Sequence, residues 1–90
     1  MGFTTLEWRD GALWLLDQRK LPGRVEEVQV RTSAEAARAV RDMVVRGAPA
    51  IGCAAAYGVA LAAREAARSP NPGPTFAAGL EELRAARPTA

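Results

Sequence analysis

The sequence predicts an α+β fold, in which a three-stranded antiparallel meander comes first and a three-helix bundle-like segment follows. Three observations indicate this order. Short apolar runs separated by turn-forming residues fill the chain up to about residue 30, which is typical of strands. A helix-capping sequence follows at Thr32, and alanine-rich stretches bounded by glycine and proline continue from there. Ninety residues suffice for one small domain, with strands at about 6–30 and helices at about 33–86.

The first two strands are predicted at residues 6–9 and 12–16. The Asp-Gly pair between them is typical of a two-residue β-hairpin turn. Residues 17–23 include a proline and a glycine and supply a second reversal of the chain. Residues 25–30 alternate in part between valine and polar side chains, so they are the third strand of the meander.

The first helix is predicted to begin after Thr32 and to run from about residue 33 to residue 45. Thr32 and Glu35 match a capping box, in which the threonine oxygen accepts the Glu35 amide and the glutamate accepts the Thr32 amide. Gly47 stands just beyond this helix, where a left-handed residue is favoured.

The second helix is predicted at residues 50–67, with Pro49 at its first position, where the fixed φ of proline suits a helix start. Small residues dominate one side of it, which indicates a close packing face. The prolines and the glycine of residues 69–74 are expected to break the helix. Thr75 is then expected to cap a third helix over residues 76–86.

The composition indicates a small core and excludes several classes of protein. Alanine makes up much of the 49% hydrophobic content and buries little area per residue, so the domain is expected to depend on another domain or subunit. A net charge of +2 does not favour nucleic acid. The absence of histidine and a single cysteine leave no structural zinc set, and no metal or cofactor is expected. With no long apolar run and no signal peptide, we expect no membrane partner and a cytoplasmic location.

Residues 46–49, Arg-Gly-Ala-Pro, carry the candidate site. They join two predicted helices, and the second helix should present free amides at residues 50–52 together with the positive end of its dipole. Gly47 and Ala48 have almost no side chain, so a ligand can approach their backbone, and Arg46 adds a forked cationic donor. These features favour a phosphate or carboxylate site, although such a turn between helices is often only a turn.

The chain shows no catalytic group. Cys53 lies one turn into the second helix, where the dipole could stabilise a thiolate, but the usual burial of cysteine favours a structural role. There is no histidine to act as a general base, and the acidic residues show no spacing that pairs them. The residues therefore predict a binding element without catalytic residues of its own.

The wording of the central segment resembles a known family. Residues 41–52, RDMVVRGAPAIG, and the AAAYG that follows at residues 54–58 are similar to the N-terminal signature of methylthioribose-1-phosphate isomerases. That superfamily also contains the regulatory subunits of translation initiation factor 2B and ribose-1,5-bisphosphate isomerase. Trp8, Leu21-Pro22 and the RPTA at residues 87–90 resemble the same family.

The resemblance implies conversion of 5-methylthioribose 1-phosphate to 5-methylthioribulose 1-phosphate in methionine salvage. It also implies substrate contacts at Arg46, Gly47, Ala48 and Arg87. The family's catalytic cysteine and aspartate lie in a larger, C-terminal Rossmann-like domain, which is absent from this chain, so the ninety residues alone are expected to be inactive. A homodimer formed through or with that domain is implied. The alternatives are a phosphosugar-binding or regulatory module like initiation factor 2B, and a ribose-1,5-bisphosphate isomerase.

Overall fold

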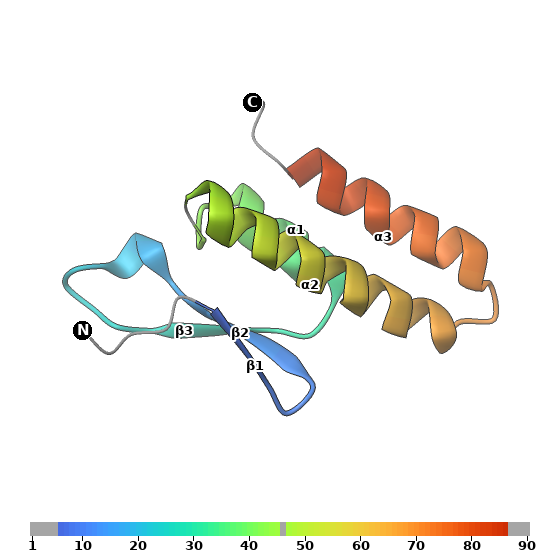
Figure 1. Cartoon of the computed structure of the whole chain (residues 1–90), viewed down its shortest axis with the longest axis horizontal. Helices are drawn as coiled ribbons and strands as arrows, with labels where there is room; N and C mark the ends of the chain where they lie inside the picture. Colours follow the sequence, from blue (N-terminus) through green and yellow to red (C-terminus); the bar gives the residue numbers. More distant parts are fainter. Residues whose placement is uncertain (1–5, 46, 87–90) are drawn as a thin grey trace.

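The computed structural model describes residues 6–45 and 47–86, and it confirms the predicted α+β fold (Figure 1). Three strands are followed by three α-helices, with one short 3-10 helix, η1, between the second and third strands. The elements are β1 (Leu6–Arg9), β2 (Ala12–Leu16), η1 (Gln18–Lys20), β3 (Glu27–Val30), α1 (Ser33–Arg41), α2 (Ala48–Ala67) and α3 (Pro72–Ala86).

The sheet is the predicted antiparallel meander, with strand order β1-β2-β3. Asp10 and Gly11 have φ angles of 52° and 75°, the pair of positive values that a type I′ hairpin turn requires. Leu13 and Leu15 of β2 are fully buried. Leu13 pairs with Val30 of β3 and Leu15 with Val28, so these apolar side chains share the face that packs on the helices.

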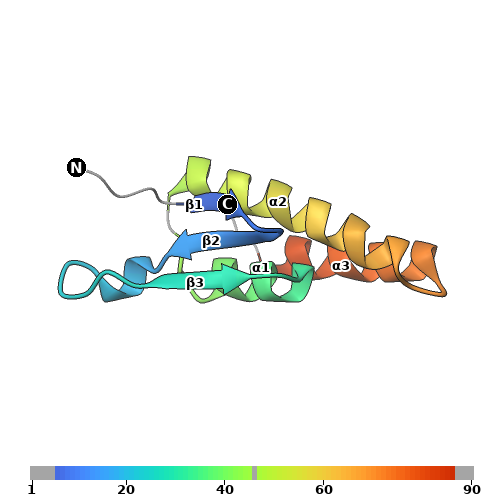
Figure 2. The same ribbon diagram turned by 90° about the horizontal axis from the view of Figure 1, so that it is seen from below.

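The helices α1 and α2 lie between the sheet and α3 (Figures 1 and 2). A single apolar cluster joins these layers, because its buried members come from β2, β3 and all three helices; they include Leu13, Leu15, Val30, Val40, Leu61 and Leu83. Small residues bring α2 and α3 close together. A Cβ atom built at Gly79 of α3 would lie 2.9 Å from the Cβ of Ala62 in α2. Any larger residue at position 79 would therefore push the two helices apart.

The capping box of α1 forms with one change. The Thr32 hydroxyl accepts a hydrogen bond from the Glu35 amide at 3.1 Å, as predicted. The Glu35 carboxylate accepts from the Arg31 amide at 2.7 Å, whereas the sequence predicted the amide of Thr32. Ser33 adds a contact that the sequence did not predict, because its hydroxyl donates to the Glu65 carboxylate of α2 at 2.7 Å. The start of α1 is thereby attached to α2.

Helix α1 ends at Arg41, four residues before the predicted end. The Met43 amide bonds to the Val40 carbonyl at 3.3 Å and the Val44 amide to the Ala39 carbonyl at 3.0 Å, the two bonds of a Schellman motif. Met43 occupies its left-handed position with φ 63°. The prediction that Gly47 fills this position is wrong, because the chain turns earlier and uses a side-chain-bearing residue.

Replacement of Met43 by glycine is expected to raise the free energy of unfolding by about 1 kcal/mol, since a left-handed residue with a Cβ costs about that amount. The Met43 side chain is 52% exposed, so little burial is lost. Urea denaturation followed by circular dichroism measures the change. Met43→Ala keeps the Cβ and should leave stability nearly unchanged, and equal effects from both variants would contradict the interpretation.

Helix α3 starts at Pro72, within the segment that the sequence predicted as a break. The first amides of a helix have no intrahelical partner, so Pro72 and Pro74 lose nothing by lacking an N–H. Thr75 is therefore in the first turn and does not cap the helix. Its amide donates to the Asn71 carbonyl at 3.0 Å, and its hydroxyl lies 2.7 Å from that of Ser69.

Helix α2 is the longest element, and it carries the only cysteine of the chain. Cys53 is exposed on its surface, so the expected structural burial of this thiol is wrong. Across residues 6–45 and 47–86, no helix combines the length and the apolarity that a membrane crossing needs.

Candidate anion-binding site at the junction of α1 and α2

The junction between α1 and α2 has two parts, one after α1 that is buried in the core and one at the start of α2 that is exposed to solvent. Val44 and Val45 are 4% and 1% exposed, so they fix the approach to the turn in the core. Gly47 and Pro49 are exposed. Arg46, between the buried and the exposed part, lies outside the residues that the structure describes.

Gly47 is the N-cap residue of α2, with φ 93° and ψ 133°. This backbone conformation is accessible almost only to glycine, so the conformation alone explains why glycine occupies position 47. Among the described residues, and apart from Gly47 and its two chain neighbours, no atom lies within 4 Å of the position of a Cβ at Gly47. A ligand therefore has space to approach the backbone here.

The free amides begin two residues earlier than the sequence predicted. Helix α2 begins at Ala48, with Pro49 in the next position. The Ile51 amide donates to the Gly47 carbonyl at 2.9 Å and is used by the helix itself, as is the amide of Gly52 by helix geometry. The amides without an intrahelical partner belong to the first turn, at Ala48 and Ala50.

The electrostatics of this end of α2 favour an anion. The first turn contains no acidic residue, and no side chain caps the helix. The helix dipole places about half a positive charge at this terminus, where backbone amides point outward. An oxyanion that docks at Ala48 and Ala50 would meet both the amides and the dipole.

The 3-10 helix η1 supports the junction from the sheet side. The Gln18 amide donates to the Val44 carbonyl at 2.9 Å, two residues before Arg46. Asp17, which is buried, sets the geometry of η1 by accepting from the Arg19 amide at 3.0 Å and from the Arg19 guanidinium at 2.9 and 3.0 Å. The hydrogen bonds from the Arg19 side chain lower the pKa of Asp17 below its ordinary value of 3.8.

Acid should therefore weaken the support of the junction. The depressed pKa means that Asp17 stabilises the fold at every pH above 3.8 and loses this contribution as the pH falls through its lower folded value. Asp17→Asn should flatten that part of the pH profile of stability, measured by urea denaturation between pH 5 and about pH 2. Glu26→Gln is the control, and an unchanged profile in Asp17→Asn would contradict this role.

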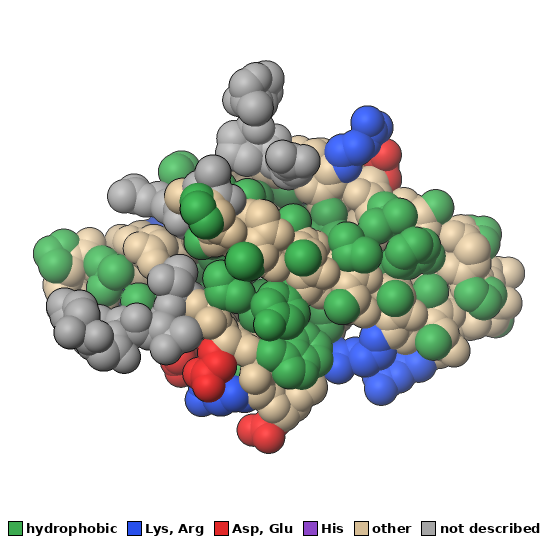
Figure 3. All heavy atoms as spheres, in the orientation of Figure 1, with side chains coloured by type: hydrophobic (Ala, Val, Ile, Leu, Met, Phe, Trp, Pro, Cys, Tyr) green, Lys and Arg blue, Asp and Glu red, His purple; other side chains and the backbone are tan. Residues whose placement is uncertain are grey.

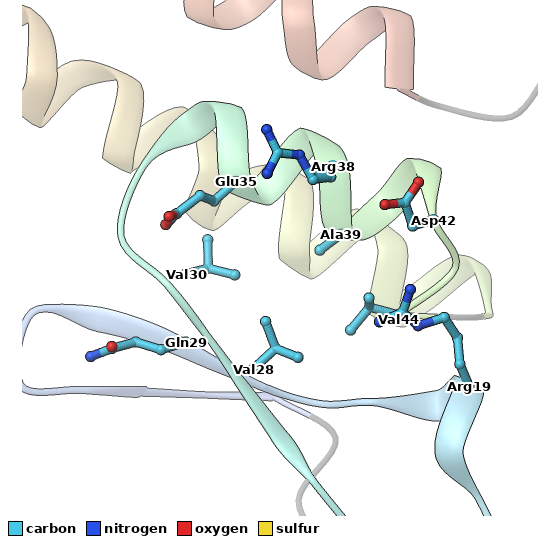
Figure 4. A pocket seen from close by; sticks show the side chains of 9 residues that line it. All are labelled: Arg19, Val28, Gln29, Val30, Glu35, Arg38, Ala39, Asp42 and Val44. Atoms are coloured by element: carbon cyan, nitrogen blue, oxygen red, sulfur yellow. The ribbon is translucent and has the colours of Figure 1, made fainter.

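A separate hollow of about 220 Å³ lies between β3 and α1, lined by side chains of β3, α1 and η1 and by Asp42 and Val44, which follow α1 (Figure 4). Its floor is apolar, with Val28, Val30 and Ala39. Its rim mixes both charges; the charged side chains are Arg19, Glu35, Arg38 and Asp42. Carboxylates at the rim oppose the binding of a phosphate, so this hollow is a poorer anion site than the junction.

Of the predicted contacts, Gly47 is the N-cap of α2 and Ala48 is its first residue, whereas the sequence predicted both to lie in the turn before the helix. The other two predicted contacts, Arg46 and Arg87, lie outside the described residues. The sequence did not predict that Gln18 supports the junction. Its contact is a backbone hydrogen bond to Val44, which any residue type except proline could form.

Comparisons with known proteins place this junction in context. No protein-family model matches the chain. The methylthioribose-1-phosphate isomerase of Alkalilimnicola ehrlichii is 58% identical over 87 residues, which cover 94% of this chain and 25% of that protein. The crystal structure of 5-methylthioribose 1-phosphate isomerase from Pyrococcus horikoshii is similar with a TM-score of 0.81 and 35% identity, covering 94% of this chain and 24% of that one.

A second solved structure, translation initiation factor eIF-2B, subunit delta, from A. fulgidus, gives a TM-score of 0.80 and 40% identity over 94% of this chain and 25% of that one. The chain thus spans about a quarter of the length of the relatives that it matches. Over 94% of its length, the chain is therefore similar in sequence to a protein named methylthioribose-1-phosphate isomerase and similar in fold to a solved structure of such an enzyme.

Proposed function

We propose that this chain is the substrate-binding, N-terminal part of a sugar-phosphate isomerase that converts 5-methylthioribose 1-phosphate to 5-methylthioribulose 1-phosphate. The observation that carries the proposal is the open, acid-free N-terminus of α2 at Gly47 and Ala48, in a chain 58% identical to a methylthioribose-1-phosphate isomerase. The backbone there has space and unpaired amides for a phosphate. Arg46 and Arg87 would add the two cationic contacts.

The catalytic groups in this proposal belong to a larger, C-terminal Rossmann-like domain beyond the ninety residues. The chain supplies a binding surface, and the reacting carbon atoms lie against the other domain. We place the assembled enzyme in the cytoplasm, as a homodimer in methionine salvage and hence in amino-acid biosynthesis, and without a nucleic-acid partner. The reaction moves hydrogen within a single sugar phosphate, so the proposal includes no cofactor.

Two alternatives share the same fold. The likeness to an eIF-2B delta subunit supports a regulatory module that binds a phosphorylated ligand without turnover. A ribose-1,5-bisphosphate isomerase would use the same phosphate site. Among the solved structures, the two likenesses are nearly equal, but the curated relatives from Alkalilimnicola ehrlichii and Albidiferax ferrireducens, at 58% and 53% identity, are both named methylthioribose-1-phosphate isomerase, which favours the first proposal.

A complementation experiment tests the proposal. The ninety-residue chain is mixed with a second polypeptide that comprises the remaining three quarters of the Alkalilimnicola ehrlichii relative. Isomerisation of 5-methylthioribose 1-phosphate should appear in the mixture and in neither polypeptide alone. Ribose 1,5-bisphosphate is assayed in parallel, and a preference for it would favour the other isomerase.

Binding of the sugar phosphate without turnover, measured by calorimetry, would favour the regulatory module. An assembled mixture that neither binds nor converts either sugar phosphate would overturn the proposal.

A further inference from the structure

The outward face of α2 is apolar along its entire length. Its exposed positions recur every three or four residues and form one stripe, which we call the α2 face; they are Pro49, Gly52, Cys53, Ala56, Val59, Ala60, Ala63 and Ala67. None of these side chains is charged, and no charged residue occurs between Ala48 and Ala63. At about 1.5 Å per residue the stripe is about 30 Å long.

A helix that covers a core normally turns polar residues toward water, and a helix that is apolar all round is normally buried on all sides. Up to Ala63, helix α2 has no charged side chain on any side, and yet one of its sides faces the solvent. Its inner side is buried through Ala54, Leu61 and Ala66, and yet Val59 on the outer side is 39% exposed. The space-filling view shows hydrophobic side chains gathered over α2, with charged ones at the margins (Figure 3).

The shape of the chain explains why it cannot cover this face itself. Its dimensions are 44 × 32 × 17 Å, and Figure 3 looks along the thinnest one, onto a broad face. Helix α3 packs against α1 and α2 on another side, and the sheet occupies a third (Figure 2).

We infer that the α2 face is the surface on which the remainder of the isomerase polypeptide docks. This inference rests on the proposed function. The matched relatives continue for about three times the length of this chain, which supplies a covering partner. Small side chains at Gly52, Ala56 and Ala60 allow a packed element to approach closely, toward the short end of the usual interaxial distances.

The position of the face adds a second argument. The stripe begins at Pro49 and Gly52, on the same turn whose amides face the candidate anion site. Among the described residues nothing walls that site on its outer side, whereas a small-molecule site normally encloses most of its ligand. A segment seated on the α2 face would stand beside the site and supply its missing wall.

The test uses the chain and the remaining three quarters of the Alkalilimnicola ehrlichii relative as separate polypeptides. Light scattering should show an equimolar complex, and Ala60→Lys should raise its Kd at least tenfold. Ala85→Lys is the matched control, because Ala85 is exposed on α3 near Glu81 and Arg84, and it should leave the Kd unchanged. Cys53, the single cysteine of the chain, provides a second readout.

Maleimide labelling of Cys53 should slow at least tenfold in the complex, with mass spectrometry identifying the labelled chain. A complex insensitive to Ala60→Lys with unprotected Cys53 would overturn the inference, even if isomerisation is restored. Self-association of the chain alone that Ala60→Lys abolishes would assign the face to a second copy and overturn it as well. A complex that meets both expectations but has no activity would contradict the proposed function and leave the docking surface intact.

Discussion

Replacement of Gly79 by valine is expected to lower the free energy of unfolding by about 3 kcal/mol, the upper end of the usual cost of overpacking a core. A Cβ at Gly79 would lie 2.9 Å from the Cβ of Ala62 and 3.0 Å from the hydroxyl oxygen of Ser33. The methyl group of Ala62 has no rotamer to change. Ser33 cannot turn away freely, because its hydroxyl donates to Glu65 at 2.7 Å. The backbones of α2 and α3 must therefore separate.

Gly52→Val provides the matched control for this prediction. Gly52 is also helical, but among the described residues no atom beyond its chain neighbours and the backbone of its own helix lies within 4 Å of the position of its Cβ. Valine and glycine differ by only a few tenths of a kcal/mol in helix propensity, so the stability should change by less than about 0.5 kcal/mol. Urea denaturation of both variants measures the contrast, and equal destabilisation would show that the close approach of α3 to α2 is not the cause.

Arg46→Ala is expected to lower kcat/KM for 5-methylthioribose 1-phosphate about 100-fold in the complemented enzyme. Removal of a charged hydrogen-bonding partner from a bound anion typically costs about 2–5 kcal/mol. The stability of the chain should not change, because the proposed role is contact with the ligand. Steady-state kinetics on the mixture of the two polypeptides gives the measurement.

Arg41→Ala controls for the removal of positive charge near the junction. Arg41 is exposed at the end of α1, and its guanidinium is 3.9 Å from the carboxylate of Asp42, so it makes only a weak local pair. Its removal should change kcat/KM by less than about twofold, since a surface ion pair of this kind contributes little. Full activity of Arg46→Ala would remove Arg46 from the proposed site.

The sheet was predictable from the sequence because its signals are local. The Asp10-Gly11 turn fixes the hairpin, and the buried leucines of β2 require a matching apolar face on each neighbour. The ends of the helices were less predictable. The prolines of residues 72–74 forbid the interior of a helix but suit its first turn, and residue type alone does not distinguish these two positions.

The candidate site was predicted in part. Glycine at residue 47 was correctly linked to the helix junction, but its role was assigned to the end of α1, where the structure has Met43. Residue type does not indicate that Met43 is left-handed. We attribute this conformation to the next residue, Val44, whose side chain packs in the core. The shift of the free amides to Ala48 and Ala50 follows from the start of α2 at Ala48, two residues before the predicted start.

The reversal between α2 and α3 has a consequence for the unfolded chain. Proline occupies residues 70, 72 and 74, and each one removes backbone conformations that an unfolded segment would otherwise sample. Less entropy is therefore lost when the reversal forms, and the Ser69–Thr75 hydrogen bond at 2.7 Å closes a loop that is already restricted. The connection is therefore conformationally restricted. We expect α2 and α3 to be packed against each other at a fixed distance before the proposed remainder of the polypeptide docks on the α2 face.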